Sequence, residues 1–306
     1  MNPMLADLLR VLELERIEIN LFRGESRDIG SPQVFGGQVL GQALVAATAT
    51  VEPDRLVHSL HAYFLRAGDF NKRIVYEVDR SRDGGSFTSR RVVAIQDGQQ
   101  IFHMSASFQL AELSIDHQAQ MPTVPPPESL KDVRDWLGTM GDKMPQGMRN
   151  VMMRDRPFEF RPVNADRISA QLESGPTASG SVKPEGILLQ QWFKAADRLP
   201  DGEALHRCLL AYASDYYLLS ACTIPHGIAI EQATLRVASI DHAMWFHRPV
   251  RVDEWLLYVV DSPSASGARG LARGSIFNQK GELVASTAQE GLFRRPSKPA
   301  SWGTGH

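Results

Sequence analysis

The same order of elements occurs twice along the chain, and this internal repeat restricts the fold more than any other feature. A charge-free segment rich in alanine, leucine and glutamine predicts a helix at 35–47 that is buried on nearly every side. Four segments typical of antiparallel strands follow it, at 56–65, 74–79, 87–95 and 101–108. A second helical segment at 203–219 precedes four further strand-like segments, at 235–246, 255–260, 270–277 and 283–292. We therefore expect two α+β units, each with one helix wrapped by an antiparallel sheet.

Local matches between the halves indicate a duplicated domain. The matching residues lie at nearly one sequence offset: His61-Ala62 with His242-Ala243, Tyr76 with Tyr258, Asp79 with Asp261, and the turn residue Gly98 with Gly281. The first helical segment also carries Gly37 and Gly41, four residues apart. We expect this bare face to lie close against a curved sheet.

A proline-rich segment separates the halves, since the prolines of Met121-Pro-Thr-Val-Pro-Pro-Pro127 forbid a helix and a central strand. We expect an N-terminal domain over 1–120, a linker over 121–154 and a C-terminal domain over 155–306. Four methionines of the linker recur every four residues and predict packing of a connecting segment rather than a lid: Met140, Met144, Met148 and Met152. The Ser-, Gly- and Pro-rich residues 164–186 predict a surface loop.

Composition and charge exclude several classes of partner. With 33 basic and 35 acidic residues the net charge is −2, which provides no global field for a nucleic acid or an anionic membrane. Asp7, Glu13 and Glu15 among leucines predict an amphipathic helix rather than a signal peptide. The uncharged stretch 29–51 is interrupted by Pro32, glutamines and glycines, so we expect no membrane span and a cytoplasmic location.

Several common catalytic motifs are absent from the sequence. It contains no G-x-G-x-x-G, no P-loop and no G-x-S-x-G elbow, so dinucleotide binding, nucleotide hydrolysis and serine-hydrolase chemistry lose their usual support. Its only cysteines, Cys208 and Cys222, are expected to be free thiols of a reducing compartment. Neither has a flanking base in the sequence that would favour a nucleophilic role.

Three polar residues of the second half stand out from apolar surroundings. On the expected helix 203–219, Asp215 lies about 20° from Cys208, at the border of the apolar stripe. The first helix has no acidic residue, so the repeated scaffold does not require Asp215. Ser239 and Gln289 lie inside apolar strand segments. Taken singly, each of the three is compatible with an ordinary structural role, as a solvated or paired carboxylate or a satisfied core group.

The histidines do not predict a metal site. Residues alternate faces along a strand, so His58 and His61 point apart. Asp241 and His242 point apart for the same reason, although this pair could serve acid/base chemistry with groups elsewhere. We therefore expect neither a metal nor another cofactor.

Five longer motifs, in this order, resemble those of the acyl-CoA thioesterase II family, the TesB-like enzymes. They are Val34-Phe-Gly-Gly-Gln-Val-Leu-Gly-Gln-Ala-Leu44, Leu56-Val-His-Ser-Leu-His-Ala-Tyr-Phe-Leu-Arg66, Ala211-Tyr-Ala-Ser-Asp215, Ser239-Ile-Asp-His-Ala-Met-Trp-Phe-His-Arg-Pro249 and Leu283-Val-Ala-Ser-Thr-Ala-Gln-Glu-Gly291. The resemblance implies a tandem hotdog fold and hydrolysis of fatty acyl-CoA to free fatty acid and CoA. The family's catalytic Asp, Thr and Gln fall on Asp215, Ser239 and Gln289, with Ser239 keeping the hydroxyl of the threonine it replaces.

The resemblance also implies roles for these residues and for others. Asp215 would be the base or water-orienting carboxylate, Gln289 and Ser239 would fix the water, and a backbone amide near the helix would receive the oxyanion. Candidate substrate-binding residues are four arginines for the CoA phosphates and one histidine: Arg66, Arg73, Arg90, Arg91 and His242. Acyl-CoA is the expected partner, together with further copies of this chain in a homo-oligomer, a dimer or tetramer of double-hotdog chains.

Two other functions stay open at this point. One is a hotdog hydratase that adds water to an enoyl-CoA, with Asp215 and His242 as acid and base, and the other is an acyl-CoA-binding protein without catalysis. For any of them we expect one site per chain, because the first helix offers only Gln38 and Gln42, which are not bases near neutral pH.

Overall fold

The structure is a computed structural model that describes residues 1–31, 33–139, 153–173, 189–228 and 235–295. The first half contains α1 (Pro3–Leu12), β1 (Glu15–Glu18), β2 (Leu21–Gly24), α2 (Gly36–Thr48), β3 (Arg55–Phe64), β4 (Ile74–Asp83), β5 (Phe87–Gln96) and β6 (Gln99–Leu110). The second half contains β7 (Phe158–Pro162), β8 (Leu189–Ala195), α6 (Glu203–Ser214), β9 (Arg236–Ser239), β10 (Asp241–Phe246), β11 (Leu256–Ser266), β12 (Arg269–Asn278) and β13 (Leu283–Arg294). Shorter helices are η1 (Pro127–Ser129), α3 (Val133–Thr139), α5 (Ala165–Glu173), η3 (Leu218–Cys222) and η4 (Ile224–His226).

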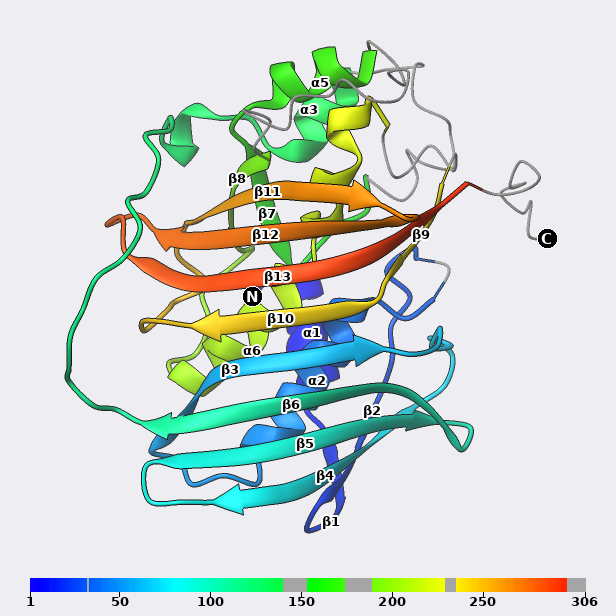
Figure 1. Ribbon diagram of the computed structural model, residues 1–306, viewed down its shortest axis with the longest axis vertical. Coiled ribbons are helices and arrows are strands. Elements are labelled where there is room, and N and C mark those ends of the chain that lie inside the picture. Colours follow the sequence, from blue (N-terminus) through cyan, green and yellow to red (C-terminus); the bar gives the residue numbers. More distant parts are fainter. Residues whose placement is uncertain (32, 140–152, 174–188, 229–234, 296–306) are drawn as a thin grey trace.

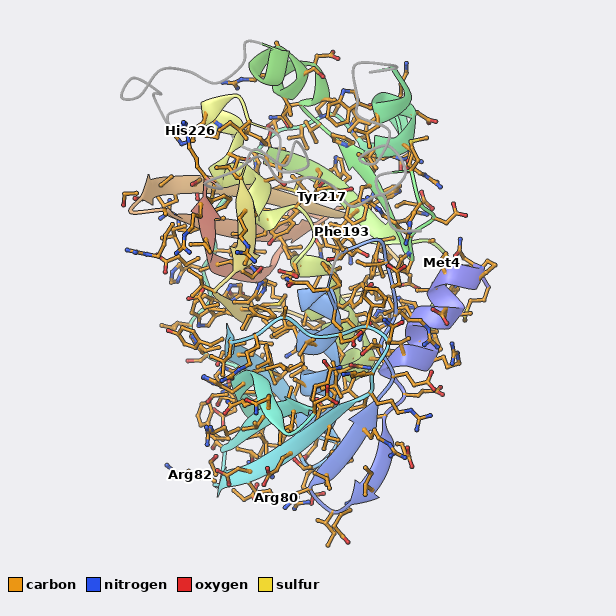
Figure 2. All side chains as sticks on the ribbon, turned by 90° about the vertical axis from the view of Figure 1, so that its right-hand side faces the viewer. Met4, Arg80, Arg82, Phe193, Tyr217 and His226 are labelled. Carbon is orange, nitrogen blue, oxygen red and sulfur yellow. The ribbon has the colours of Figure 1, made fainter. Side chains whose placement is uncertain are left out.

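All these strands belong to one antiparallel sheet. Its order is β1-β2-β4-β5-β6-β3-β10-β13-β12-β11-β8-β7, and β9 pairs with β13. The halves repeat one arrangement, β4-β5-β6-β3 and β11-β12-β13-β10, and join where β3 pairs with β10. Figure 1 shows α2 and α6 behind the middle of this sheet, and Figure 2 shows the N-terminal helix, marked by Met4, outside them. The tandem hotdog fold expected from the sequence is therefore confirmed.

The expected strands are present, although one of them, 235–246, is divided into β9 and β10, and two other expected elements differ. The predicted helix 203–219 ends at Ser214, because Tyr217 adopts a left-handed backbone with φ of +60° and starts a new, tighter turn. The predicted loop 164–186 is wrong in its first part, where α5 forms. The rest of that loop, and the methionines at 140, 144, 148 and 152, lie outside the described residues.

One of the repeat matches is out of register by one residue. Tyr76 and Tyr258 are true counterparts, since both are buried and both donate a phenol hydrogen to an acceptor of the adjacent helix segment, Gln42 Oε1 at 2.6 Å and the Ser214 carbonyl at 3.1 Å. The His-Ala match fails this test, because His61 is exposed and His242 is fully buried. Counterparts must lie on the same face of a strand, so His242 corresponds to Leu60, which is also fully buried.

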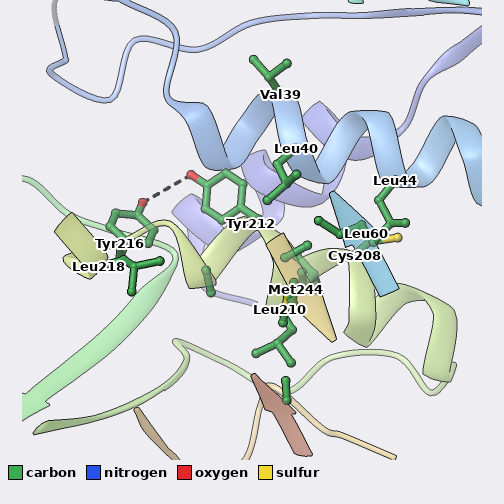
Figure 3. Close-up of a cluster of buried hydrophobic side chains, with 14 of the residues drawn as sticks. Val39, Leu40, Leu44, Leu60, Cys208, Leu210, Tyr212, Tyr216, Leu218 and Met244 are labelled. Atoms are coloured by element: carbon green, nitrogen blue, oxygen red, sulfur yellow. Dashed lines mark hydrogen bonds between the residues drawn. The ribbon is translucent and has the colours of Figure 1, made fainter. Parts of the chain in front are cut away.

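Gly37 and Gly41 of α2 face the other central helix rather than the sheet. Ten of its thirteen residues are buried, as expected for a charge-free helix. A Cβ on Gly37 would lie 2.3 Å from the carbonyl oxygen of Tyr212, and one on Gly41 would lie 3.3 Å from Tyr212 Cβ. The expectation that this bare face meets a curved sheet is thus wrong, since it lets α2 and α6 approach closely (Figure 3).

The proline-rich segment is held against the second half. Trp192 donates its indole hydrogen to the Pro125 carbonyl at 3.0 Å, and Arg161 donates to the Pro127 carbonyl at 2.7 Å. Met121 and Val124 pack on a buried cluster that includes Trp192. Because both halves share one sheet, the domain limits at residues 120 and 155 stay a prediction.

Candidate active site

Asp215, Ser239 and Gln289 lie together where the two halves meet. The amide nitrogen of Gln289, on β13, donates to Asp215 Oδ1 at 2.8 Å and to Ser239 Oγ at 3.0 Å. The three residues come from segments up to 74 positions apart. The structure thus brings together the three residues that the sequence singled out, and their catalytic role stays a prediction.

The carboxylate of Asp215 lies at the N-terminus of α2. Asp215 is the residue after α6, and the backbone N–H of Gly37 donates to its side chain. The N-terminal end of a helix favours an anion, because its first amides have no acceptor within the helix. A Cβ on Gly36 would lie 2.7 Å from Asp215 Oδ2, so only glycine allows this approach.

Burial has the largest influence on the pKa of Asp215. Its side chain is 7% exposed, and removal from water raises the pKa of the carboxyl above its ordinary value. The hydrogen bonds from Gln289 and Gly37 act in the opposite direction. The sequence predicted a partly desolvated border residue on a longer helix. The observed position, beyond the end of α6 and against α2, is more enclosed than that.

A β-bulge shapes the strand that carries Ser239. Ser239 stands opposite Gly291 and Ala243 opposite Ala288, so three residues of one strand, 240–242, face two of β13. The bulge divides the predicted strand 235–246 into β9 and β10. Asp241 Oδ1 accepts from the backbone N–H of Glu290 at 2.6 Å, which gives this side chain a structural role in the bulge.

A cavity of about 160 Å³ adjoins the cluster and is lined in part by Ser239 and Gly36. Most of its other walls come from the first half. They include apolar side chains of α2, β3 and β6: Val39, Phe64, Ile101 and Phe102. A cavity whose lining combines polar groups, among them Ser239 and Arg66, with apolar side chains fits a ligand that joins a reactive polar group to a hydrocarbon chain.

His242 does not line this cavity. Its side chain is fully buried on β10, with Nε2 3.0 Å from Ser214 Oγ and Nδ1 3.8 Å from Asp215 Oδ1. Burial lowers the pKa of its imidazole to about 4, so the ring is neutral near pH 7. The full burial of this ring does not favour direct contact with substrate, and the expectation that His242 binds substrate stays a prediction.

The four arginines differ in their suitability for binding phosphate. Arg66 is exposed and lines the cavity, with one N–H donated to the Gln100 carbonyl. Arg73 and Arg91 are exposed, and Arg73 lies 3.5 Å from Glu25. Arg90 is 2% exposed.

The guanidinium of Arg90 is occupied inside the fold. Its nitrogens donate to the hydroxyl and carbonyl of Thr50, to Asp83 and to the carbonyls of Arg82 and Ser89. These bonds use every N–H that a guanidinium offers. The expectation that Arg90 binds CoA phosphate is therefore wrong, because its role is to fasten β5 to the end of α2.

The described residues offer little support for other chemistry. Among them, no group of three His, Cys, Asp or Glu side chains is arranged to hold a metal ion. Cys208 and Cys222 are buried free thiols, and burial raises the pKa of Cys208 to about 12, which disfavours a thiolate nucleophile. Within the same part of the chain, no helix has the length and apolar character needed to cross a bilayer.

Sequence reasoning alone missed the contribution of Gly36 and Gly37. The available signal was a Gly-Gly pair at the start of a helix whose N-cap, Phe35, offers no capping side chain. Such an end leaves backbone N–H groups for an external anion, here the carboxylate of the other half.

Comparisons with known proteins agree with this architecture. A family model described as acyl-CoA thioesterase matches residues 179–292, and one described as acyl-CoA thioesterase N-terminal domain matches residues 23–109. Acyl-CoA thioesterase 2 of Haemophilus influenzae is 40% identical over 300 residues, which are 96% of this chain and 99% of that protein. Human acyl-coenzyme A thioesterase 8 is 40% identical over 292 residues, with 93% of this chain and 88% of that protein covered.

Solved structures show the same relationship. An acyl-CoA thioesterase II, TesB2, from Mycobacterium marinum is similar with a TM-score of 0.75 and 43% identity, covering 96% of this chain and all of that one. A protein from Alicyclobacillus acidocaldarius described as having a hot dog fold shares the fold, with a TM-score of 0.70 at 19% identity. The chain belongs to the acyl-CoA thioesterase II family, hydrolases built here from two hotdog units.

Proposed function

We propose that the protein hydrolyses fatty acyl-CoA thioesters to free fatty acid and CoA with a water positioned by Asp215, Gln289 and Ser239. The observation that carries this proposal is the cluster of these three side chains at the N-terminus of α2, beside a cavity with partly apolar walls. A thioester carbonyl is already electrophilic, so such a site needs to orient a water, accept its proton and stabilise an oxyanion.

Each member of the cluster has a distinct task. Asp215 accepts the proton of the water, and Gln289 holds Asp215 Oδ1 and Ser239 Oγ through one amide group. Because Ser239 Oγ accepts from Gln289, its own hydrogen remains available for the water or the thioester. Gly36 lines the cavity, and its N–H, the first of α2, has no carbonyl acceptor within the helix, so it is our candidate oxyanion donor.

The site is proposed to occur once per chain. The sheet register makes Val57 the first-half counterpart of Ser239, and Ala106 the counterpart of Gln289. Neither side chain has a polar atom, and no carboxylate lies on α2. The first half instead supplies walls of the cavity and the helix end that receives Asp215. Arg66 remains the best placed of the arginines to contact CoA. The cytoplasmic location and the homo-oligomer remain expectations.

The decisive experiment measures thiol release from acyl-CoA esters of graded chain length. Free CoA should appear in step with free acid. Loss of enoyl absorbance without thiol release would instead identify a hydratase, and binding without turnover would identify a carrier. Either of these results would overturn the proposal.

Changing Ser239 tests the hydroxyl. We expect Ser239→Ala to lower kcat by roughly 10-fold or more, because Gln289 loses an acceptor and the site loses a donor. Ser239→Thr keeps the hydroxyl and should retain most activity. Steady-state thiol release with both variants is the measurement, and a Thr variant less active than the Ala variant would contradict the role of the hydroxyl.

The pH dependence should follow the carboxyl of Asp215. We expect kcat/KM to decline as pH falls through a pKa above the ordinary value of 3.8, because burial raises the pKa and only the ionised form accepts a proton. Unfolding must be followed in parallel. Burial lowers the pKa of His242 to about 4, so the unfolded state takes up a proton first and stability declines from about pH 6.5 toward pH 4. A rate that increases steadily below pH 7 would exclude a carboxylate base.

A further inference from the structure

The ring of His242 lies against both residues at the end of α6. Its Nε2 is 3.0 Å from Ser214 Oγ, and its Nδ1 is 3.8 Å from Asp215 Oδ1. Ser214 and His242 are both fully buried, and the Asp215 side chain is 7% exposed. The imidazole therefore contacts the carboxylate from the protein interior, while the cavity lies next to Gly36 and Ser239.

The repeated scaffold does not need a histidine at this position. The counterpart of His242 in the first half is Leu60, which is equally buried and apolar. The Nδ1 atom of His242 has no hydrogen-bond partner, and an unpaired polar atom in the interior costs stability. A leucine would fill the space without this cost, so the imidazole suggests a role in the site.

Two tautomers of the ring are compatible with its neighbours, and one of them presents a hydrogen to the carboxylate. Nε2 lies against a hydroxyl, which can donate or accept, whereas Nδ1 lies near a carboxylate, which when ionised can only accept. The tautomer with its hydrogen on Nδ1 satisfies both neighbours if the hydroxyl of Ser214 donates to Nε2. In the structure that hydroxyl donates to the Ala211 carbonyl at 2.9 Å, so this tautomer requires the hydroxyl to turn from that acceptor to Nε2.

The other groups near Asp215 do not titrate between pH 5 and 9. Burial raises the pKa of Tyr212, Tyr216 and Tyr258, with that of Tyr216 at about 12, so the three phenols stay neutral. Arg156, 5.9 Å from the ring centre of Tyr216, stays charged. From β13 and α2, Asp215 receives only the amide of Gln289 and the N–H of Gly37.

We propose that His242 is a positioning residue for Asp215: anchored through Ser214, its Nδ1–H holds the ionised carboxylate in the orientation that presents it to the water. This proposal rests on the function proposed above. The distance of 3.8 Å exceeds a hydrogen bond, so the ring acts here as a nearby oriented dipole, and contacts of this kind shorten when a substrate fills the site. His242 does not touch the substrate.

Two substitutions, each with a side-chain amide, test the two ring nitrogens of His242 separately. His242→Asn places an amide donor near the position of Nδ1, toward Asp215, and gives up the bond to Ser214. His242→Gln reaches the position of Nε2 and leaves Asp215 without its donor. In thiol-release assays over pH 5–9, we expect the Gln variant to lower kcat by roughly 10- to 100-fold and to move the acid limb upward by about one pH unit. The Asn variant should retain most of the wild-type kcat, and the acid limb of its pH profile should stay at the wild-type position.

Two further variants keep the test decisive. Asp215→Asn combined with His242→Gln should be no slower than Asp215→Asn alone, because His242 acts through Asp215, whereas a purely structural role would give additive losses. Ser214→Ala removes the anchor without changing the ring and should shift the limb in the same direction. Thermal unfolding of each variant shows whether it is folded.

The outcomes distinguish this inference from the function on which it rests. If Asp215→Asn is inactive while the Asn and Gln variants of His242 share one rate and one pH profile, the positioning role is wrong and the base is retained. If Asp215→Asn keeps near wild-type turnover, the proposed base is wrong and the role of His242 is lost with it. Additive losses in the double variant would also overturn the positioning role.

Discussion

Replacing Asp215 with asparagine should lower kcat by roughly 10²- to 10⁴-fold while leaving substrate binding nearly unchanged. The amide has the size of the carboxylate and keeps an oxygen that can accept from the Gln289 side chain at the 2.8 Å contact. It has no basic site for the proton of the attacking water. Steady-state thiol release, with kcat and KM determined separately, measures the loss.

The same substitution should not weaken the fold. Burial raises the pKa of Asp215, so the folded state carries the ionised carboxylate at a cost. That cost accumulates as pH increases from the ordinary value of 3.8 to the raised pKa and is fully present above it. We expect Asp215→Asn to unfold at the same temperature as the wild type at pH 8 or at a higher one. A variant that is both inactive and much less stable would indicate a structural carboxylate, and near-normal turnover would remove Asp215 from the reaction.

Much of the fold could be predicted because local rules and tertiary packing agree. The segments at 56–65, 87–95 and 283–292 alternate buried with less buried side chains over most of their length and end at turns, so their hydrophobic pattern alone identifies strands. The turn residues Gly98 and Gly281 both have positive φ, which explains why glycine recurs in the two hairpins. The absence of charged residues from 35–47 likewise predicted a buried helix, and α2 is buried along most of its length.

The errors arose where tertiary contacts override the local pattern. The helical pattern of 203–219 continues past Ser214, yet the left-handed Tyr217 turns the chain away and leaves Asp215 against α2. The His-Ala match ignored strand faces, because a one-residue shift is invisible in a sequence comparison but reverses which side chain is buried. The bulge beside Gln289 likewise has no local signal, since it depends on the register with β13.

The candidate site could be assembled from the sequence only with the help of the family resemblance. Singly, Asp215, Ser239 and Gln289 were compatible with structural roles, and their proximity depends on three segments that meet only in the folded chain. The type of a residue does not show whether its side chain is free to bind a ligand. The charge of Arg90 suggested phosphate binding, but its hydrogen bonds are all made within the fold. The contact between Asp215 and α2 also required knowledge of how the halves face each other.

Because Asp215 lies against α2, we also expect Gly37→Ala to have a large effect on activity and stability. The new Cβ would lie 2.3 Å from the Tyr212 carbonyl oxygen and 2.5 Å from the ring of Phe35. A backbone oxygen cannot yield as a flexible side chain does, so α2 and α6 must separate. Overpacking of this kind costs about 1–3 kcal/mol. The better helix propensity of alanine offsets at most about 1 kcal/mol of it.

Activity should suffer more than stability in this variant. The N–H of Gly37 donates to Asp215, and displacement of α2 moves both this donor and the proposed oxyanion donor at Gly36. Because a misplacement of about 1 Å can cost 10²-fold in rate, we expect kcat to fall by roughly 10- to 100-fold together with a lower unfolding temperature.

Gly41→Ala is the matched control for this substitution. It adds the same methyl group to the same helix, but its Cβ would lie 3.3 Å from the flexible Leu12 side chain and 3.3 Å from Tyr212 Cβ. Gly41 also lies one turn away from Asp215 and its hydrogen-bond partner Gly37. We therefore expect an unfolding temperature close to that of the wild type and a kcat within about twofold of it. If both variants lost activity equally, the effect would reflect general loosening of the two helices. If neither did, the end of α2 would have no part in holding the carboxylate.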